Sequence, residues 1–169
     1  MSARSRPFKR IEKRLVGRTA PTTTAATSAR MSQVRQRDTT PELLVRRAFR
    51  AFGLSYRTRN RDLPGSPDLA NRAHRWAVFV HGCYWHRHKS CAKATIPRSN
   101  VEFWAAKFDY NVKRDRTARA ALRRLGYSVL TVWQCEAESP SKLNGRLANF
   151  ARSLVPRSDR NARAVSRAR

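Results

Sequence analysis

The chain has 169 residues and a formal net charge of +26, with 37 Lys and Arg against 11 Asp and Glu. This length suits one domain with appended tails, and it suffices for a core that needs no disulfides. The sequence has neither a run of about 18 apolar residues nor an apolar segment after its basic start, so we expect no membrane span and no secretory signal. The expected location is the cell interior.

The positive charge is spread over the whole chain. Residues 1–30 carry +7 and residues 155–169 carry +4, which leaves +15 on residues 31–154. A folded region this basic predicts a polyanionic partner, nucleic acid first, although charge alone does not separate an enzyme from a binding module. Residues 1–30 are basic and Thr/Ala/Ser-rich, and we expect them and the basic residues 155–169 to be disordered tails around one folded domain at 31–154.

The first helix is expected to begin near Thr40 and to stop at Gly53. Thr40 is a candidate N-cap, Pro41 suits the first helical position, and Glu42 suits the positive helix start. The apolar positions that share one face at helical spacing are Leu44, Ala48, Ala51 and Phe52.

Extended segments are expected next. Leu54–Thr58 resembles a short strand, and a turn over Leu63–Leu69 leads into an extended segment that opens with Asp68. Trp76–Val80 is apolar and β-prone and is bounded by Gly82, which predicts a buried strand that delivers side chains to a site.

The second half alternates helix and strand. We expect a helix from Val101 to about Leu125, with a break allowed near Asp109–Tyr110, then a strand over Tyr127–Trp133 and a helix over Lys142–Leu154. The apolar positions of the long helix are Phe103, Trp104, Phe108, Val112, Ala118, Leu122 and Leu125. Together the elements predict an α/β single domain with a central mixed sheet flanked by helices.

A cluster of histidines and cysteines follows the central predicted strand. Cys83, His88 and Cys91 have the spacing C-x4-H-x2-C, and Cys135, the remaining cysteine, follows the next predicted strand. Sulfur and nitrogen are the ligands of tetrahedral zinc, so we expect a structural Zn²⁺ here. The alternative is a chance grouping of thiols and surface histidines, and the odd number of cysteines argues against a disulfide framework.

Acidic and histidine side chains remain after this assignment. A phosphodiester is cleaved by Mg²⁺ with a base that takes the proton of water, and one or two carboxylates suffice to hold the ion. Asp68 opens one strand and can face the main chain at the end of the next. His86 is held between zinc ligands and suits a rigid general base, and Asp115 on the long helix is a candidate to orient it.

Each of these residues also has a simpler interpretation. Asp68 can be a turn residue, and Glu42 a helix-start charge. His81 and His86 can be neighbours that only support the zinc ligands. Asp115 can be a solvated ion pair among basic neighbours, which contributes little stability.

The order of the motifs is more specific than any one residue. Along the chain they are Glu42, Leu63–Asp68, Val78–His88, Glu102–Trp104, Asn111, Arg114–Asp115 and Val132–Glu136. Over residues 31–154 this order resembles the very-short-patch repair (Vsr) DNA mismatch endonucleases. That family is similar in fold to restriction-endonuclease-like PD-(D/E)xK nucleases with an added structural zinc. The resemblance implies Mg²⁺-dependent nicking of one DNA strand next to the T of a T·G mismatch left by deamination of 5-methylcytosine.

The resemblance also implies roles for single residues. Asp68 would be the catalytic carboxylate that binds Mg²⁺, with Glu42 in the outer environment of the ion. His86 would be the general base oriented by Asp115, and His81 would contact the region of the scissile phosphate. The zinc ligands would be Cys83, His88, Cys91 and Cys135.

Aromatic residues would open the DNA at the mismatch. The resemblance implies that Tyr84, Trp85 and Trp104 wedge into the base stack, where a mismatched pair costs least to unstack; the alternative is that they are ordinary core aromatics. The chain departs from the family at Val80, where members can have Thr, and at Gln134, where Glu is frequent. Tyr84 replaces a frequent Phe.

The implied partner is double-stranded DNA with a T·G mismatch, bound by a monomer in the cytoplasm near the nucleoid, with other repair proteins as further candidate partners. The rival hypothesis is a non-catalytic zinc module that binds nucleic acid. A third hypothesis keeps the nuclease chemistry and changes the target to unmismatched or modified DNA.

Overall fold

Three strands form a mixed sheet in the order β1–β2–β3 in the computed structural model, which describes residues 37–154. The predicted tails at 1–30 and 155–169 lie outside the described residues. The strands are β1 (Leu69–Asn71), β2 (Trp76–His81) and β3 (Ser128–Trp133). The helices are α3 (Thr40–Ala51), α4 (Val101–Arg124), the short α5 (Gln134–Ala137) and α6 (Pro140–Leu154). The expected α/β domain with a central mixed sheet is confirmed.

The register of the strands brings three chain segments to one edge of the sheet. β1 runs antiparallel to β2, with Leu69 opposite Val78. β2 runs parallel to β3, with His81 opposite Trp133. The ends of β2 and β3 and the start of β1 therefore meet, and the residues that follow or precede these strands lie close together.

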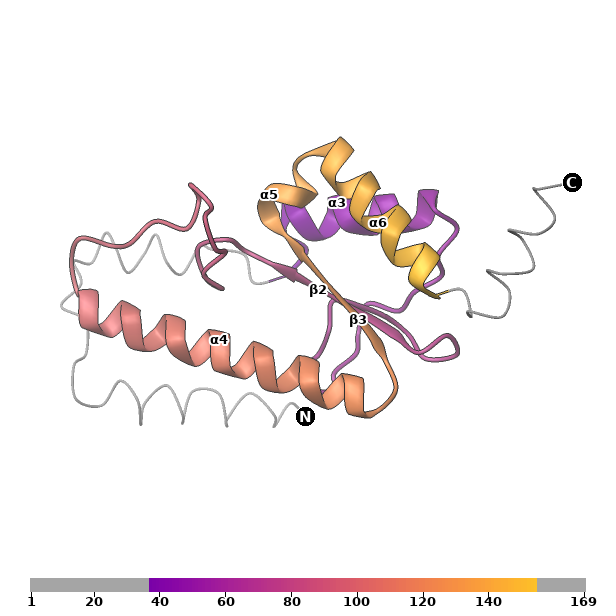
Figure 1. Cartoon of the computed structure of the whole chain (residues 1–169), viewed down its shortest axis with the longest axis horizontal. Coiled ribbons are helices and arrows are strands. Elements are labelled where there is room, and N and C mark those ends of the chain that lie inside the picture. Colours follow the sequence, from indigo (N-terminus) through magenta and orange to yellow (C-terminus); the bar gives the residue numbers. More distant parts are fainter. Residues whose placement is uncertain (1–36, 155–169) are drawn as a thin grey trace, which may run out of the picture.

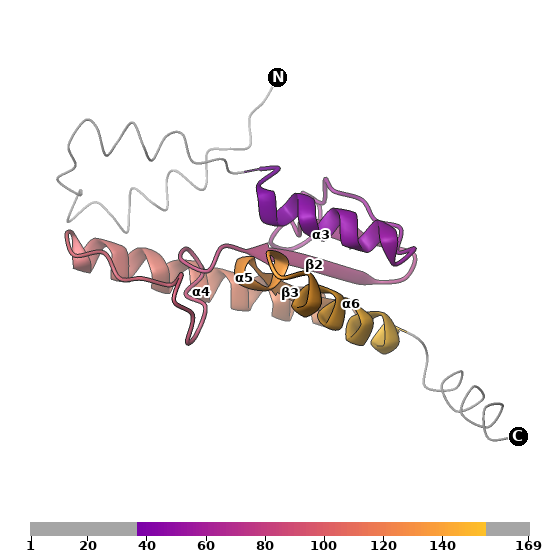
Figure 2. The same cartoon turned by 90° about the horizontal axis from the view of Figure 1, so that it is seen from above.

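Helices cover both faces of the sheet. α3, α5 and α6 lie on one side and α4 on the other (Figures 1 and 2). In β2, Trp76 and Val78 join the core under α3 and α6, while Ala77 and Phe79 join the core under α4. A strand buried on both faces is apolar at nearly every position, which explains the unbroken apolar run in the sequence.

The predicted N-cap and part of the predicted buried face of the first helix were wrong. The N-cap is Thr39, one residue earlier than expected. The buried apolar positions are Val45 and Phe49. Of the expected positions, Ala48 packs against the same core, whereas Ala51 and Phe52 are exposed. Glu42, Val45 and Phe49, at spacings of three and four residues, form the buried face.

One further expectation fails, and one alternative that the sequence left open is decided. Leu54–Thr58 is no strand, because only Arg57 pairs with Ala70, through hydrogen bonds of 2.8 and 3.0 Å, and β1 is too short to pair further. α4 is continuous through Asp109–Tyr110, because residues on both sides of this point are buried against the rest of the domain.

Among the described residues, no helix has the length and apolar character needed to cross a membrane.

Candidate functional site

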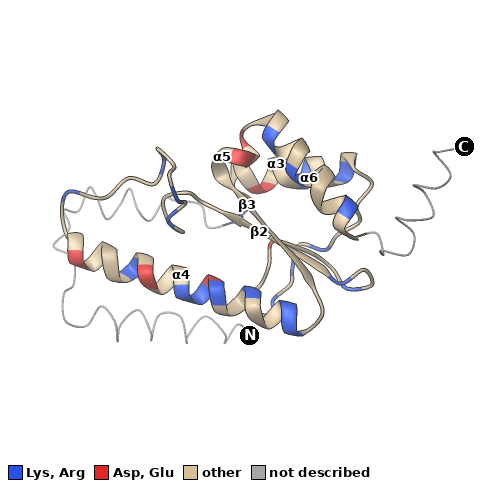
Figure 3. Cartoon of the chain, viewed as in Figure 1, with Lys and Arg blue, Asp and Glu red and all other residues tan. Residues whose placement is uncertain are grey.

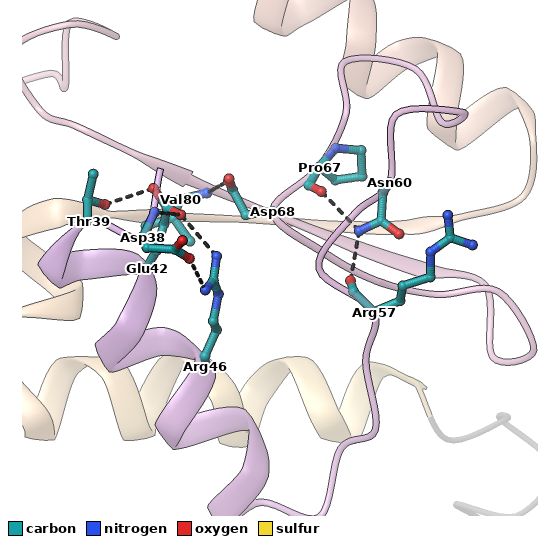
Figure 4. Close-up of polar contacts among 9 residues, drawn as sticks. All are labelled: Asp38, Thr39, Glu42, Arg46, Arg57, Asn60, Pro67, Asp68 and Val80. Atoms are coloured by element: carbon teal, nitrogen blue, oxygen red, sulfur yellow. Dashed lines mark hydrogen bonds and ion pairs between the residues drawn. The ribbon is translucent and has the colours of Figure 1, made fainter. Parts of the chain in front are cut away.

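A tight turn places Asp68 at the edge of the sheet. Gly65 and Ser66 both have positive φ values, of +73° and +51°. The buried Asn60 donates its side-chain amide to the carbonyls of Arg57, at 2.8 Å, and of Pro67, at 3.0 Å (Figure 4). The turn is thereby fixed from within, immediately before the acid.

The turn also packs tightly on α4. A Cβ at Gly65 would lie only 2.5 Å from Cβ of Ala118. Only glycine satisfies both the backbone conformation and this close approach. The Pro-Gly sequence of the turn therefore has a packing reason as well as a conformational one.

Asp68 faces the end of β2, as expected. Its Oδ2 accepts a hydrogen bond of 2.7 Å from the backbone N–H of Val80 (Figure 4). Burial raises the pKa of Asp68 to about 6; the Val80 hydrogen bond lowers it, the charge of Glu42 raises it, and the charges of Arg46 and His86 lower it. A nearby cation would favour the ionised carboxylate, and the second carboxylate oxygen is the one that a cation would use.

Glu42 is a charged residue at the start of α3 and also lies close to Asp68. Its buried carboxylate accepts hydrogen bonds from the hydroxyl of Thr39, at 2.8 Å, and from the N–H of Asp38, at 3.1 Å, and so ties the residues that precede α3 to its first turn. Arg46, one turn along the helix, donates to the same carboxylate at 3.1 Å. The guanidinium of Arg46, which sequence reasoning missed, is thus held beside the two acids, and its i, i+4 spacing from Glu42 is the signal that could have revealed it.

Two histidines and an aspartate form a buried cluster next to Asp68. The rings of His81 and His86 stack with centroids 3.9 Å apart and planes 10° apart. Asp115 is hydrogen-bonded through Oδ2 to Nδ1 of His86, and the same oxygen lies 3.9 Å from Nδ1 of His81. The three side chains place ligand-type atoms within 4.8 Å of one another, so they could also hold a cation.

Electrostatics assign the protons in this cluster. Burial raises the pKa of Asp115, but the hydrogen bond of His86 and the charges of His81, His86 and Arg114 outweigh it, and the net pKa is lowered. Burial, with the charge of His86, lowers the pKa of His81 to about 3. Because the ionised Asp115 can only accept a hydrogen bond, Nδ1 of His86 is the donor in this pair.

The loop after β2 is held to α4. The N–H of His86 donates to the carbonyl of Gly82 at 3.1 Å, and that of His88 donates to the carbonyl of Cys83 at 3.0 Å. The side-chain amide of Asn111 donates to the carbonyl of Trp85 at 3.0 Å. Because Asn111 and Asp115 are four residues apart, the helix presents both to this loop.

The structure also brings the four expected zinc ligands together. Their sulfur and nitrogen atoms all lie within 4.8 Å of one another. Nδ1 of His88 lies 3.5 Å from Sγ of Cys83 and 3.3 Å from Sγ of Cys135. Usual zinc bond lengths and tetrahedral angles separate a sulfur from a nitrogen ligand by about 3.6 Å, so the donor set and its spacing fit a zinc ion.

The three expected wedge residues form one aromatic cluster. Ring centroids lie 5.0 Å apart for Tyr84 and Trp85, 6.0 Å for Tyr84 and Trp104, and 5.9 Å for Trp85 and Trp104. All three are half-buried. The ammonium of Lys107 lies 5.8–5.9 Å from the centroids of Trp85, Phe103 and Trp104. The cluster is thus partly open and carries a cation at its face.

A family model described as DNA mismatch endonuclease Vsr matches residues 21–93. The type II nicking enzyme V.XorIIP of Xanthomonas oryzae pv. oryzae is 40% identical over 120 residues, which cover 71% of this chain and 88% of that protein. The type II nicking enzyme V.NmeAIP of Neisseria meningitidis is 35% identical over 132 residues, 78% of this chain and 94% of that protein. The DNA mismatch endonuclease Vsr of Escherichia coli K12 is 37% identical over 119 residues, 70% of this chain and 76% of that protein. This chain belongs to the Vsr family of DNA mismatch endonucleases.

Proposed function

We propose that this protein nicks one DNA strand next to the T of a T·G mismatch by Mg²⁺-dependent hydrolysis, in very short patch repair of deaminated 5-methylcytosine. The observation that carries the proposal is the placement of Asp68 beside the His86–Asp115 pair at one edge of the sheet. Family membership supports the same reaction class. We also infer a restriction-endonuclease-like fold and a domain that spans residues 31–154.

In this proposal the residues divide the chemistry between them. Asp68 and the main chain at the end of β2 would hold Mg²⁺, with Glu42 further out. The ion would supply Lewis acidity and order the attacking water. His86 accepts a proton from that water at Nε2, and Asp115 stabilises the resulting imidazolium through Nδ1.

The neutral His81 has a different task. It lies at the end of β2 with its ring stacked on that of His86. It supplies a flat ring face and a hydrogen-bonding group near the phosphate. The contact of Val80 with Asp68 is made by its backbone N–H and so does not depend on the side chain at this position. A Thr at this position would present the same backbone group.

The basic surface and the aromatic cluster supply the contacts with DNA. Lys and Arg predominate along the second half of α4, which borders the site (Figure 3). Such side chains neutralise phosphates, and we expect log affinity to fall with log salt concentration by about 0.9 per phosphate contacted. Tyr84, Trp85 and Trp104 would enter the base stack at the mismatch, with the protein acting as a monomer.

A panel of duplexes tests the proposal. Each strand is end-labelled in turn, and the duplex contains T·G, another mismatch or the matched pair in one sequence context, with and without MgCl₂. We expect one labelled strand to be nicked beside the T of T·G and the matched duplex to stay intact. Equal nicking of matched DNA would support the third hypothesis, and binding without nicking on every duplex would support the non-catalytic module.

A further inference from the structure

Four rings in successive contact connect the candidate zinc centre to the candidate base. The ring of His88 lies parallel to the indole of Trp133, with centroids 4.2 Å apart and planes 10° apart. The indole meets the ring of His81 edge to face at 5.5 Å and 72°. His81 in turn stacks on His86. Trp133 is the one member of this column that is neither an expected metal ligand nor part of the proposed acid–base cluster.

The fold fixes Trp133 from two directions. It ends β3 in register with His81 at the end of the parallel strand β2, so the two side chains are neighbours on the sheet. Its backbone N–H donates to Oε2 of Glu136 at 2.9 Å, and this hydrogen bond caps α5. The helix α5 carries Cys135. The indole is therefore tied to the sheet on one side and to the candidate zinc centre on the other.

The contacts of Trp133 distinguish it from the core aromatics. It is half-buried and is a member of neither apolar core among the described residues, whereas Phe49 and Trp76 pack within one. Among the described residues its ring lies against those of His81 and His88, both at the site. A residue placed for core packing would instead contact the aliphatic side chains between the helices and the sheet.

The orientation of His86 needs such a support. The hydrogen bond from Nδ1 to Asp115 fixes one point of the imidazole, but rotation about a terminal sp³–sp² bond has a broad energy profile. The stacked face of His81 opposes that rotation only while His81 is itself held. The edge contact with Trp133 holds it, and a zinc-bound His88 would hold Trp133.

We propose that Trp133 is a positioning residue that couples the zinc-bound loop to the orientation of His81 and His86. The proposal rests on the proposed function, because it gives His86 the role of the base. It predicts that zinc at the four-residue centre supports catalysis through ring contacts as well as through the stability of the loop.

The test uses the zinc-loaded full chain with Trp133→Leu and the conservative variant Trp133→Phe. We expect Trp133→Leu to bind one zinc per chain, to keep KM for T·G duplex within about twofold, and to lower kcat by about 10–100-fold. Trp133→Phe keeps a ring and should recover most of kcat. The matched control, Phe150→Leu, removes a core ring of α6 and should lower thermal stability without lowering kcat.

A measurement without turnover accompanies the kinetics. The ring-proton NMR signals of His81 and His86, recorded without Mg²⁺ or DNA, should shift in Trp133→Leu and stay in place in Phe150→Leu. Unmoved signals with an unchanged kcat would overturn the proposal, and so would loss of zinc from Trp133→Leu. If the parent protein nicks no duplex, the proposed function fails, while the NMR signals still decide whether the ring column exists.

Discussion

Val80 donates its backbone N–H to Oδ2 of Asp68 over 2.7 Å, from the end of β2 to the residue before β1. This bond spans the antiparallel pair and holds the half-buried carboxylate of Asp68 next to the residue that precedes His81, whose ring lies on that of His86. The proposed ion site and the proposed base therefore share one edge of the sheet. Both depend on the same three strand ends.

Asp68 should make the metal-free fold less stable as the pH rises. Its folded pKa of about 6 exceeds the ordinary value of 3.8, so the native state binds the proton more tightly than the unfolded state does. The contribution of this tighter proton binding to the free energy of unfolding is fully present below about pH 4. It is lost as the pH rises through 6, and the loss is at most about 3 kcal/mol. Asp68→Asn can keep the Val80 hydrogen bond and removes this loss.

Urea unfolding in EDTA-free, metal-depleted buffer between pH 4 and 8 checks the prediction. The stability of Asp68→Asn relative to the parent should increase with pH over this interval. Added Mg²⁺ should stabilise the parent above pH 6 and leave the variant unchanged. A difference that is constant with pH would show that burial does not shift this carboxyl.

Asp115→Asn should reduce catalysis without reducing DNA binding. The amide retains the shape of the carboxylate but lacks its charge and can donate to Nδ1 of His86, which favours the wrong tautomer. We expect kcat to fall by about 10²–10⁴-fold while the Kd for T·G duplex changes little. Asp109→Asn, on the exposed side of the same helix, is the matched control. Equal kcat values for the two variants would remove Asp115 from the mechanism.

Cys135→Ser should lower the zinc content and destabilise the fold. The substitution removes one of four ligands, and structural zinc in small peptides contributes about 10–16 kcal/mol. We expect less than one zinc per chain by atomic absorption and a lower midpoint of thermal unfolding. Lys93→Ala, which removes an exposed ion pair with Glu138 next to the centre, should change neither quantity much. Full zinc content in Cys135→Ser would contradict the proposed ligand set.

Gly65→Ala should cost more stability than Gly53→Ala. Both glycines have positive φ, which costs an alanine about 1–2 kcal/mol. At Gly53 nothing lies within 4 Å of the added Cβ, whereas at Gly65 the methyl would overlap that of Ala118. We expect an additional loss of about 1–3 kcal/mol at Gly65 in chemical denaturation. Ala118→Gly in the Gly65→Ala background should recover part of that loss, and failure to do so would mean that α4 moves away freely.

Sequence periodicity predicted the elements that are long and strongly patterned. β2, β3 and α4 lie within a residue or two of their expected bounds, because continuous apolar runs and helical spacing are local signals. The spacing of Cys83, His88 and Cys91 likewise reflects one loop. Asn111 and Asp115 share a helix face by their spacing alone.

Other features depend on contacts between distant segments and leave no local pattern. The N-cap of α3 was mispredicted because two adjacent threonines precede Pro41, and the sequence does not say which one caps the helix. Leu54 to Thr58 has a strand-like composition but meets a neighbouring strand of only three residues. The buried amide of Asn60 and the ring contacts of Trp133 exist only once the sheet brings its edges together.

Strand-specific nicking of one T·G duplex by the parent, Asp68→Ala and His86→Ala tests the central claim most directly, with DNA binding measured on the same samples. The account predicts that the parent nicks in MgCl₂, while both variants bind with the affinity of the parent and nick at least about 10³-fold more slowly. Nicking at the parental rate by either variant would contradict a joint role for these two side chains.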